Sequence, residues 1–167
     1  ISIGQGEVNA TPLQIANLGA TIANRGYFIT PHVVKQIQDE QIDTLYTRRR
    51  YTKVEARHYE TVVQGMRRAV LAGTCRKANI PGIEVCGKTG TAQNPHGADH
   101  STFLSFAPKD NPKIAISVYV ENGRWGASAA LPIASLLEEY YLTDTIRRPA
   151  LLEYVKNLKI SYPYYDK

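Results

Sequence analysis

The chain has 167 residues, 43% of them hydrophobic, which suits one compact domain with its own core rather than two. The formal net charge is +5, but the basic residues are spread along the chain and only Arg48-Arg49-Arg50 forms a tight run. We therefore expect solvated surface at that run and no nucleic-acid partner. No stretch approaches the roughly 18 consecutive apolar residues of a membrane-spanning helix, which predicts a soluble chain.

The first thirty residues predict a helix. Ile1 to Gly6 has no initiator methionine and reads as the interior of a structure, so we expect a fragment or a processed product. Thr11 supplies an N-cap hydroxyl, Pro12 suits the first helical position, and Gln14 completes a capping box. The apolar positions that follow are so numerous that we expect this helix to be buried on most sides until Gly26 ends it.

Two further elements are expected before the middle of the chain. Residues 33–38 and 42–47 alternate in character around a polar turn, as in a partly exposed hairpin. Between Glu55 and Leu71 the apolar residues recur at helical spacing, and Gly73 follows. This segment predicts a second, amphipathic helix.

Three strand-like segments, 83–93, 102–107 and 113–121, are separated by short stretches rich in proline, glycine and asparagine. Such short links favour an antiparallel meander. The third segment is apolar enough to be buried on both faces, so another element should cover each side.

A last strong helix is predicted at 129–141, lying across the meander. Its apolar face is expected to contain Leu131, Ala134, Leu137 and Tyr141. We divide the chain into 1–142 and a peripheral tail, 143–167, which holds a short helical stretch at 151–158 and an aperiodic, tyrosine-rich end at 162–165.

Cys75 and Cys86 flank a Pro-Gly turn that can fold back and bring them together. One interpretation is a disulfide in an oxidising compartment. The other, which we favour, is two reduced thiols packed as small hydrophobic side chains.

Gly82 through Thr89 matches the phosphate-loop pattern G-x-x-x-x-G-K-[ST]. That loop requires a preceding strand and a helix that begins at the Lys-Thr pair. Here Ile80-Pro81 comes before the first glycine, and Gly90 disfavours a following helix. We expect an extended chain at this site and keep nucleotide binding as a remote alternative.

Lys88-Thr89-Gly90 also matches an element of the serine acyl-transfer enzymes that act on D-alanyl peptides and β-lactams. In an extended strand, Thr89 and Thr91 share one face while Lys88 and Gly90 share the other. Lys88 must therefore reach the site from the strand edge, unless a local twist turns it. Gly90 permits close approach of a neighbouring backbone.

A resemblance to a known family rests on several segments taken in order. These are Ser2 to Glu7, Thr11 to Gln14, Gly87 to Gln93, His100 to Phe103, Phe106 to Pro108 and Val120 to Gly123. Together they resemble the class B penicillin-binding proteins, and within that class the penicillin-binding protein 2 group. The resemblance covers roughly residues 1–142 and implies an α+β fold, the C-terminal part of the penicillin-binding or serine β-lactamase-like transpeptidase fold.

The resemblance implies a role for each residue of the motif. Lys88 would supply positive charge, Thr89 and Thr91 would hold the carboxylate of a D-Ala-D-Ala stem peptide or a β-lactam, Gly90 would line the same site, and the Thr91 amide would be an oxyanion donor. It implies neither metal nor cofactor. The parent would act outside the cytoplasm, on the periplasmic side of the inner membrane, with other cell-wall synthesis proteins as partners.

The same family needs a Ser-x-x-Lys nucleophile motif and a Ser-x-Asn motif, and no serine of this chain has either spacing. The chain alone should therefore be inactive. Lacking its upstream cover, it should expose a strand edge or an apolar face, and we expect self-association. A non-catalytic sensor or scaffold with the same fold is the alternative from another functional class.

His96, Asp99 and His100 are two histidines and a carboxylate in one glycine-containing turn. We interpret them as solvated turn residues rather than as a zinc site, which would need further ligands. His100 also begins the strand next to Lys88, where it can border the cleft.

Trp125 and Tyr119 could be platforms for a substrate, but the prediction we favour places both at the edge of the core. Glu121 and Asn122 follow the third strand and are expected to shape its turn.

Overall fold

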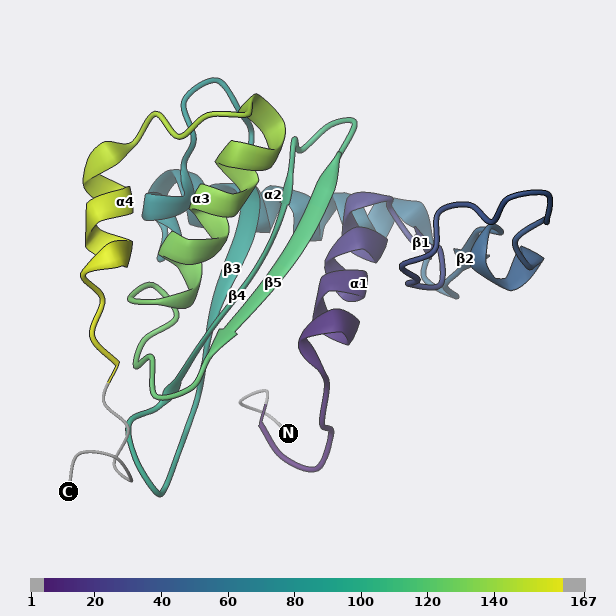
Figure 1. Ribbon diagram of the computed structural model, residues 1–167. Helices are drawn as coiled ribbons and strands as arrows, with labels where there is room; N and C mark the ends of the chain where they lie inside the picture. The colour runs from purple at the N-terminus through teal and green to yellow at the C-terminus, as the bar shows by residue number, and fades with distance from the viewer. Residues whose placement is uncertain (1–4, 161–167) are drawn as a thin grey trace.

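The computed structural model describes residues 5–160, and its centre is an antiparallel sheet in the order β3-β4-β5 (Figure 1). The strands are β3 (Cys86–Ala92), β4 (His100–Ala107) and β5 (Ile114–Val120). The predicted meander is confirmed. β3 begins three residues later than expected because the chain turns at Gly82, where φ is +79°, and forms only an isolated bridge between Ile80 and Ile83.

Helices cover both faces of the sheet, giving the α+β architecture that the sequence predicts. α3 (Ala130–Thr143) lies on one face, while α1 (Pro12–Ala23) and α2 (Ala56–Ala72) lie on the other (Figure 1). α1 begins with the predicted capping box, in which Gln14 N donates to Thr11 Oγ1 and Thr11 N donates to Gln14 Oε1.

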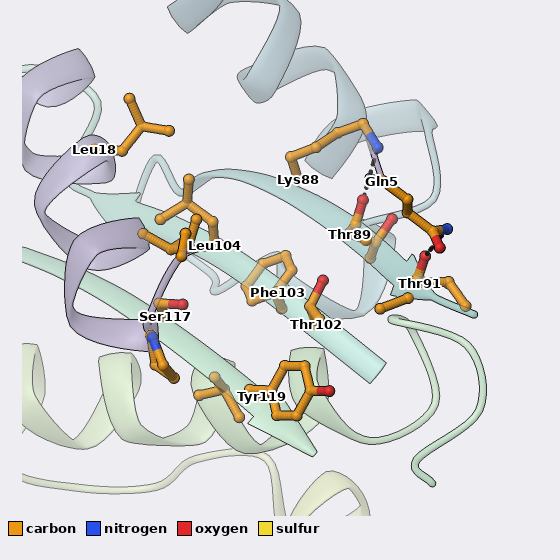
Figure 2. Close-up of a pocket in the computed structure, with 16 residues that line it drawn as sticks. Gln5, Leu18, Lys88, Thr89, Thr91, Thr102, Phe103, Leu104, Ser117 and Tyr119 are labelled. Atoms are coloured by element: carbon orange, nitrogen blue, oxygen red, sulfur yellow. Dashed lines mark hydrogen bonds between the residues drawn. The ribbon is translucent and has the colours of Figure 1, made fainter. Parts of the chain in front are cut away.

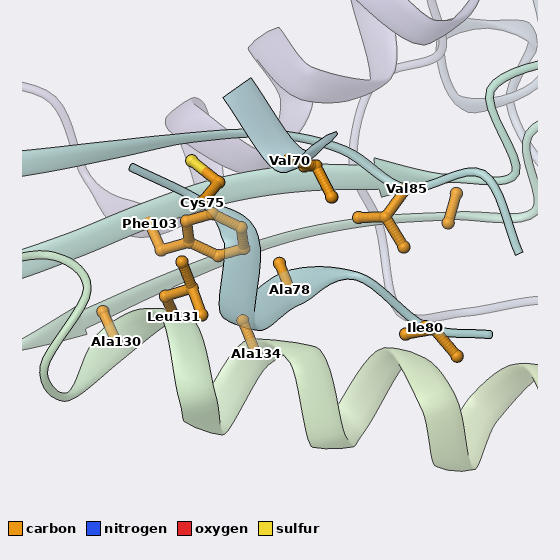
Figure 3. Close-up of a cluster of buried hydrophobic side chains, with 10 residues drawn as sticks. Val70, Cys75, Ala78, Ile80, Val85, Phe103, Ala130, Leu131 and Ala134 are labelled. Carbon is orange, nitrogen blue, oxygen red and sulfur yellow. The ribbon is translucent and has the colours of Figure 1, made fainter. Parts of the chain in front are cut away.

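A separate core fills each face. Figure 3 shows the cluster under α3, which contains Cys75 and Phe103 of β4, whereas Cys86 belongs to the cluster under α1 and α2. Both cysteines are buried and free, so the favoured interpretation of two reduced, packed thiols is confirmed and the alternative disulfide is not formed. Burial raises the pKa of the Cys86 thiol to about 12, which keeps it protonated and unreactive.

The expectation that α1 is buried on most sides is wrong. Gly19 packs tightly on the sheet, where a Cβ would lie 2.6 Å from Leu104 Cδ1, but Leu13 and Leu18 are 62% and 50% exposed. Only one face of the helix meets β4 and β5, and nothing in residues 5–160 covers the opposite apolar side.

The burial expected of β5 is also only partly correct. α3 contacts one face and α1 contacts the other, but β5 is an edge strand, so its residues stay half-buried and Tyr119 is 43% exposed. On α3, Leu131 and Ala134 are buried as predicted, whereas Leu137 and Tyr141 face outward. The buried face of α3 includes Glu138 instead of Leu137 and Tyr141. The apolar pattern alone therefore predicts part of the buried face of this helix wrongly.

The predicted hairpin between residues 33 and 47 is wrong. This segment has a single bridge, Ile37 to Glu40, followed by the short 3₁₀ helix η1 (Thr44–Tyr46), which the Asp43 side chain caps. The flanking strands β1 (Tyr27–Phe28) and β2 (Arg50–Tyr51) pair with each other and form the base of a projecting arm (Figure 1). Arg48 to Arg50 are exposed, as expected of a solvated run.

The 3₁₀ helix η2 (Arg76–Ala78) packs between α2 and α3, and the last helix, α4 (Pro149–Lys156), packs on α3 as the predicted short helical stretch. The tyrosine-rich end lies outside the described residues. None of the helices in residues 5–160 combines the length and the apolar character needed to cross a bilayer.

Candidate functional site

The Lys-Thr-Gly segment forms an outer edge of the sheet, since β3 pairs with β4 on one side and with no strand of residues 5–160 on the other. In an antiparallel ladder, the N–H and C=O of a residue point to the same side. The Thr89 and Thr91 carbonyls accept hydrogen bonds from the Lys88 and Gln5 side chains, so both residues face outward. The Thr91 N–H therefore points to the open edge.

Lys88 reaches that edge by bending around it. Its side chain begins on the sheet face that it shares with Gly90, and its ammonium donates to the Thr89 carbonyl at 2.7 Å. The structure thus confirms the first of the two routes expected from the sequence. The exposed ammonium places a positive charge beside the open main-chain groups of β3.

The hydroxyls of Thr89 and Thr91 lie together on the face toward α3, as the strand period predicts. Thr89 Oγ1 is 2.8 Å from Thr74 Oγ1, and Thr91 Oγ1 accepts the Gly126 N–H at 3.4 Å. Thr74 ends the loop after α2, and Gly126 lies in the loop between β5 and α3. Neither contact could be predicted, because each joins an isolated loop residue to a distant strand.

Gly126 has no room for a side chain. A Cβ there would lie 2.5 Å from the Gly90 carbonyl oxygen and 2.7 Å from that of Thr102. Gly90 is also tight, since a Cβ would lie 2.3 Å from Thr102 Oγ1. The neighbour at Gly90 is thus a side-chain hydroxyl, and the close approach of two backbones beside this strand depends on the missing side chain of Gly126 rather than on that of Gly90.

A cleft of about 530 Å³ lies beside this strand, between α1 and the sheet (Figure 2). Lys88 to Ala92 form one wall, with Thr102 and Tyr119 continuing along the sheet and Leu18 facing them from α1. Gln5 closes the end near Thr91. The cleft is mostly apolar, and its polar lining residues include Lys88, Thr89 and Thr91 on β3 as well as Thr102, Ser117 and Tyr119 on β4 and β5.

The β3–β4 turn is held by side-chain hydrogen bonds. Asn94 N donates to Asp99 Oδ1 at 3.2 Å, and Asn122 N donates to His100 Nδ1 at 3.1 Å. Asn122 adopts φ of +53° and shapes the turn after β5, as predicted. His96, beside Asn94, is exposed, and residues 5–160 contain no group of three side chains that could hold a metal ion.

The core-edge prediction for the two aromatic residues is wrong. The Trp125 side chain is 69% exposed. Its loop is held to the sheet by the main chain instead, since the Trp125 carbonyl accepts a hydrogen bond from Ser101 Oγ. Tyr119 lines the cleft, and its ring packs against the His100 ring in a tilted arrangement, with 5.4 Å between the ring centroids. His100 thus reaches the cleft margin through Tyr119.

Residues 82–89 do not have the geometry of a phosphate-binding loop. Cys86 to Ala92 form a continuous strand paired with β4, and no helix begins at Lys88 and Thr89. The amides that would have to curl around phosphate are held in an extended chain.

Comparison with known proteins gives consistent matches. Residues 1–137 match the family described as penicillin-binding protein transpeptidase domain. The peptidoglycan D,D-transpeptidase MrdA of Haemophilus influenzae is 36% identical over 87% of this chain and 26% of its own length.

Two solved structures are similar in fold as well. Pseudomonas aeruginosa PBP2, solved in complex with WCK 5153, has a TM-score of 0.74 and 36% identity over 85% of this chain and 31% of that one. Penicillin-binding protein A of M. tuberculosis, an imipenem acyl-enzyme complex, has a TM-score of 0.70 and 35% identity over 85% and 33%. This chain thus spans about a quarter to a third of the relatives it matches.

Proposed function

The chain belongs to the penicillin-binding protein transpeptidase family, and from this premise we propose that it is part of a peptidoglycan D,D-transpeptidase of the penicillin-binding protein 2 kind. The relatives that support the proposal are a D,D-transpeptidase named as such and a penicillin-binding protein solved as an imipenem acyl-enzyme complex. The whole protein would act outside the cytoplasm on stem peptides that end in D-Ala-D-Ala, alongside other proteins of cell-wall synthesis.

In this reaction a serine outside the present chain attacks the carbonyl carbon of the penultimate D-alanine. A tetrahedral oxyanion forms, the bond to the terminal D-alanine breaks, and that amino acid leaves with a proton on its nitrogen. An amine of a neighbouring strand then attacks the acyl-enzyme and releases the serine. A β-lactam enters by the same first step, but its leaving group stays attached by the opened ring.

Lys88, Thr89 and Thr91 divide the binding tasks of this scheme, and Thr91 has two of them. The Thr91 N–H, aimed outward, donates to the oxyanion. The Lys88 ammonium makes the edge attractive to the substrate carboxylate, and the Thr89 and Thr91 hydroxyls bind it. The single observation that carries the proposal is the open outer edge of β3, with these groups gathered within four consecutive residues.

Fluorescent-penicillin labelling of the full-length parent tests the proposal. Lys88→Ala should slow acylation at least about tenfold, the factor that 1.4 kcal/mol of lost transition-state stabilisation gives. Lys113→Ala, an exposed lysine in the β4–β5 turn, is the matched control and should label at the wild-type rate.

Undiminished labelling of Lys88→Ala would remove the role given to Lys88. A parent that takes no covalent label, while still binding penicillin reversibly, would instead support the non-catalytic sensor.

A further inference from the structure

The Gln5 side chain makes two hydrogen bonds to the β3 edge just beyond Lys88-Thr89-Gly90. Its Nε2 donates to the Thr91 carbonyl at 3.3 Å (Figure 2). Its Oε1 accepts the Gln93 N–H at 3.2 Å. The partners lie 86 and 88 residues away in the chain, and Gln5 is half-buried. Both contacts are therefore tertiary.

This pair of contacts imitates a neighbouring strand. In a parallel sheet, one residue of a strand donates its N–H to a carbonyl of the neighbouring strand. Through its own carbonyl, the same residue accepts the N–H of the residue that lies two positions further along that neighbouring strand. A carboxamide carries the same donor and acceptor on one rigid group. Gln5 thus pairs with the edge at Thr91 and Gln93 as one residue of a further strand would.

The consequence for Thr91 is a fixed orientation. Its carbonyl is held by Gln5 from the open side, and its hydroxyl accepts from Gly126 on the α3 face. Because the N–H of a strand residue points to the same side as its carbonyl, the Gln5 contact keeps the Thr91 N–H facing the open edge of β3. It also occupies the edge beyond Thr91, so an extended ligand can use the free edge only up to that N–H.

We propose that Gln5 is a positioning residue for acyl transfer, which aligns the Thr91 amide and sets the end of the ligand-binding edge of β3. The inference rests on the proposed function, since it assigns the Thr91 N–H to the oxyanion. A residue that only protects an exposed strand edge would affect stability but not the acylation step. The experiment must therefore separate these two effects.

Three variants of the full-length parent make that separation. Gln5→Met keeps the length of the side chain and removes both hydrogen bonds. Gln5→Glu keeps an acceptor for Gln93 N–H but, when ionised, cannot donate to the Thr91 carbonyl. Gln64→Met, on the exposed face of α2, is the matched control, because among residues 5–160 the Gln64 side chain bonds only to Glu60.

Stopped-flow acylation with fluorescent penicillin gives the reversible dissociation constant and the acylation rate constant separately. We expect Gln5→Met to lower the rate constant about 10- to 100-fold, as misplacement of an oxyanion donor does, while the dissociation constant changes less than about threefold. For Gln5→Glu, the rate relative to wild type should recover as pH falls toward about 4.3, where the introduced carboxylate gains a proton to donate. Gln5→Met and Gln64→Met should show no such recovery.

An acylation rate for Gln5→Met within about twofold of wild type, with or without a lower melting temperature, would overturn the inference. So would a Gln5→Glu profile parallel to that of Gln5→Met. If wild type itself is not acylated, the proposed function fails. If wild type is acylated and Gln5→Met matches it, only the role of Gln5 fails.

Discussion

Gly126 holds the β5–α3 loop against the site strand, since its N–H donates to Thr91 Oγ1 and its Cα faces the Gly90 carbonyl. Gly126→Ala should destabilise the fold by about 1–3 kcal/mol, because the added methyl meets backbone oxygens that cannot move aside. The same change should slow penicillin acylation in the parent. Chemical denaturation and labelling rates measure the two effects.

Gly65→Ala is the control for that change. Gly65 lies on the exposed side of α2, and a Cβ there meets no atom within 4 Å. The substitution should stabilise the helix by up to about 1 kcal/mol. Equal stability of the two alanine variants would show that the loop tolerates a side chain at Gly126.

Glu138 is a buried carboxyl on α3 that the proposed chemistry does not use. Neither of its oxygens has a hydrogen-bond partner within residues 5–160, and the Ser105 and Ser135 hydroxyls are likewise buried and unpartnered. Burial raises the pKa of Glu138 to about 8, against the smaller opposing effects of the Ser105 hydroxyl and the Arg148 guanidinium. The carboxyl is therefore protonated in the folded state at neutral pH.

This raised pKa predicts that stability falls as pH rises. Below an unfolded pKa of about 4.5 both states hold the proton, and between 4.5 and 8 only the folded state does. The free energy of unfolding should therefore decrease across that window, by up to about 1.4 kcal/mol per pH unit, and level off above it. Glu138→Gln should remove this slope, and thermal unfolding at several pH values checks it.

The difference in melting temperature between wild type and Glu138→Gln is the quantity to compare, because other groups titrate in both proteins. A difference that stays constant from pH 5 to pH 8 would contradict the assignment.

The motif predicts Lys88, Thr89 and Thr91 because three neighbouring residues on one strand leave a local signature. No local signature marks Gln5, Thr74 or Gly126, since 15 or more positions of the sequence separate each of them from its partner on β3. Gln5 does belong to one of the segments that carry the family resemblance, but its contacts with Thr91 and Gln93 appear only in three dimensions.

At the scale of elements, Arg148 fastens the C-terminal segment to α3. Its Nε pairs with the buried Glu139 carboxylate at 2.9 Å, and its Nη2 donates to the Ser135 carbonyl at 2.8 Å. Arg148→Ala leaves Glu139 buried without its partner, so we expect a loss of about 3–5 kcal/mol of unfolding free energy. Chemical denaturation of the parent measures it.

Glu139→Gln added to Arg148→Ala should restore part of this loss, because it removes the unpaired charge. Arg147→Ala is the control, since the Arg147 side chain is exposed and only its main-chain N–H bonds to Glu139. Additive effects of the two substitutions would show that the pair is not coupled.

The division of the chain at residue 142 stays a prediction.

The elements with strong local signals were predictable. The capping box of α1, the end of α2 at Gly73 and the meander follow from residues close together in sequence. The arm between Tyr27 and Tyr51 was not, because its two short strands pair across more than twenty residues, and alternation inside the arm was mistaken for a hairpin.

At the scale of the whole molecule, the exposed apolar side of α1 bears on association. Leu13 and Leu18 are 62% and 50% exposed, Leu18 in the wall of the cleft, and this chain matches 26% of the length of the Haemophilus influenzae relative. We therefore expect this chain to self-associate, with a mass that rises with concentration in light scattering. Leu13→Glu with Leu18→Glu should reduce that rise, and a concentration-independent monomer would contradict the expectation.

In the proposed function, the outer edge of β3 forms one wall of an acyl-transfer site. A crystal structure of the full-length parent acylated by penicillin tests it most directly. We predict that the acyl carbonyl oxygen lies about 2.7–3.1 Å from the Thr91 nitrogen, with the penicillin carboxylate bonded to the Thr89 or Thr91 hydroxyl. An acyl carbonyl oxygen without a contact to the Thr91 N–H, or a carboxylate bound away from β3, would contradict the claim.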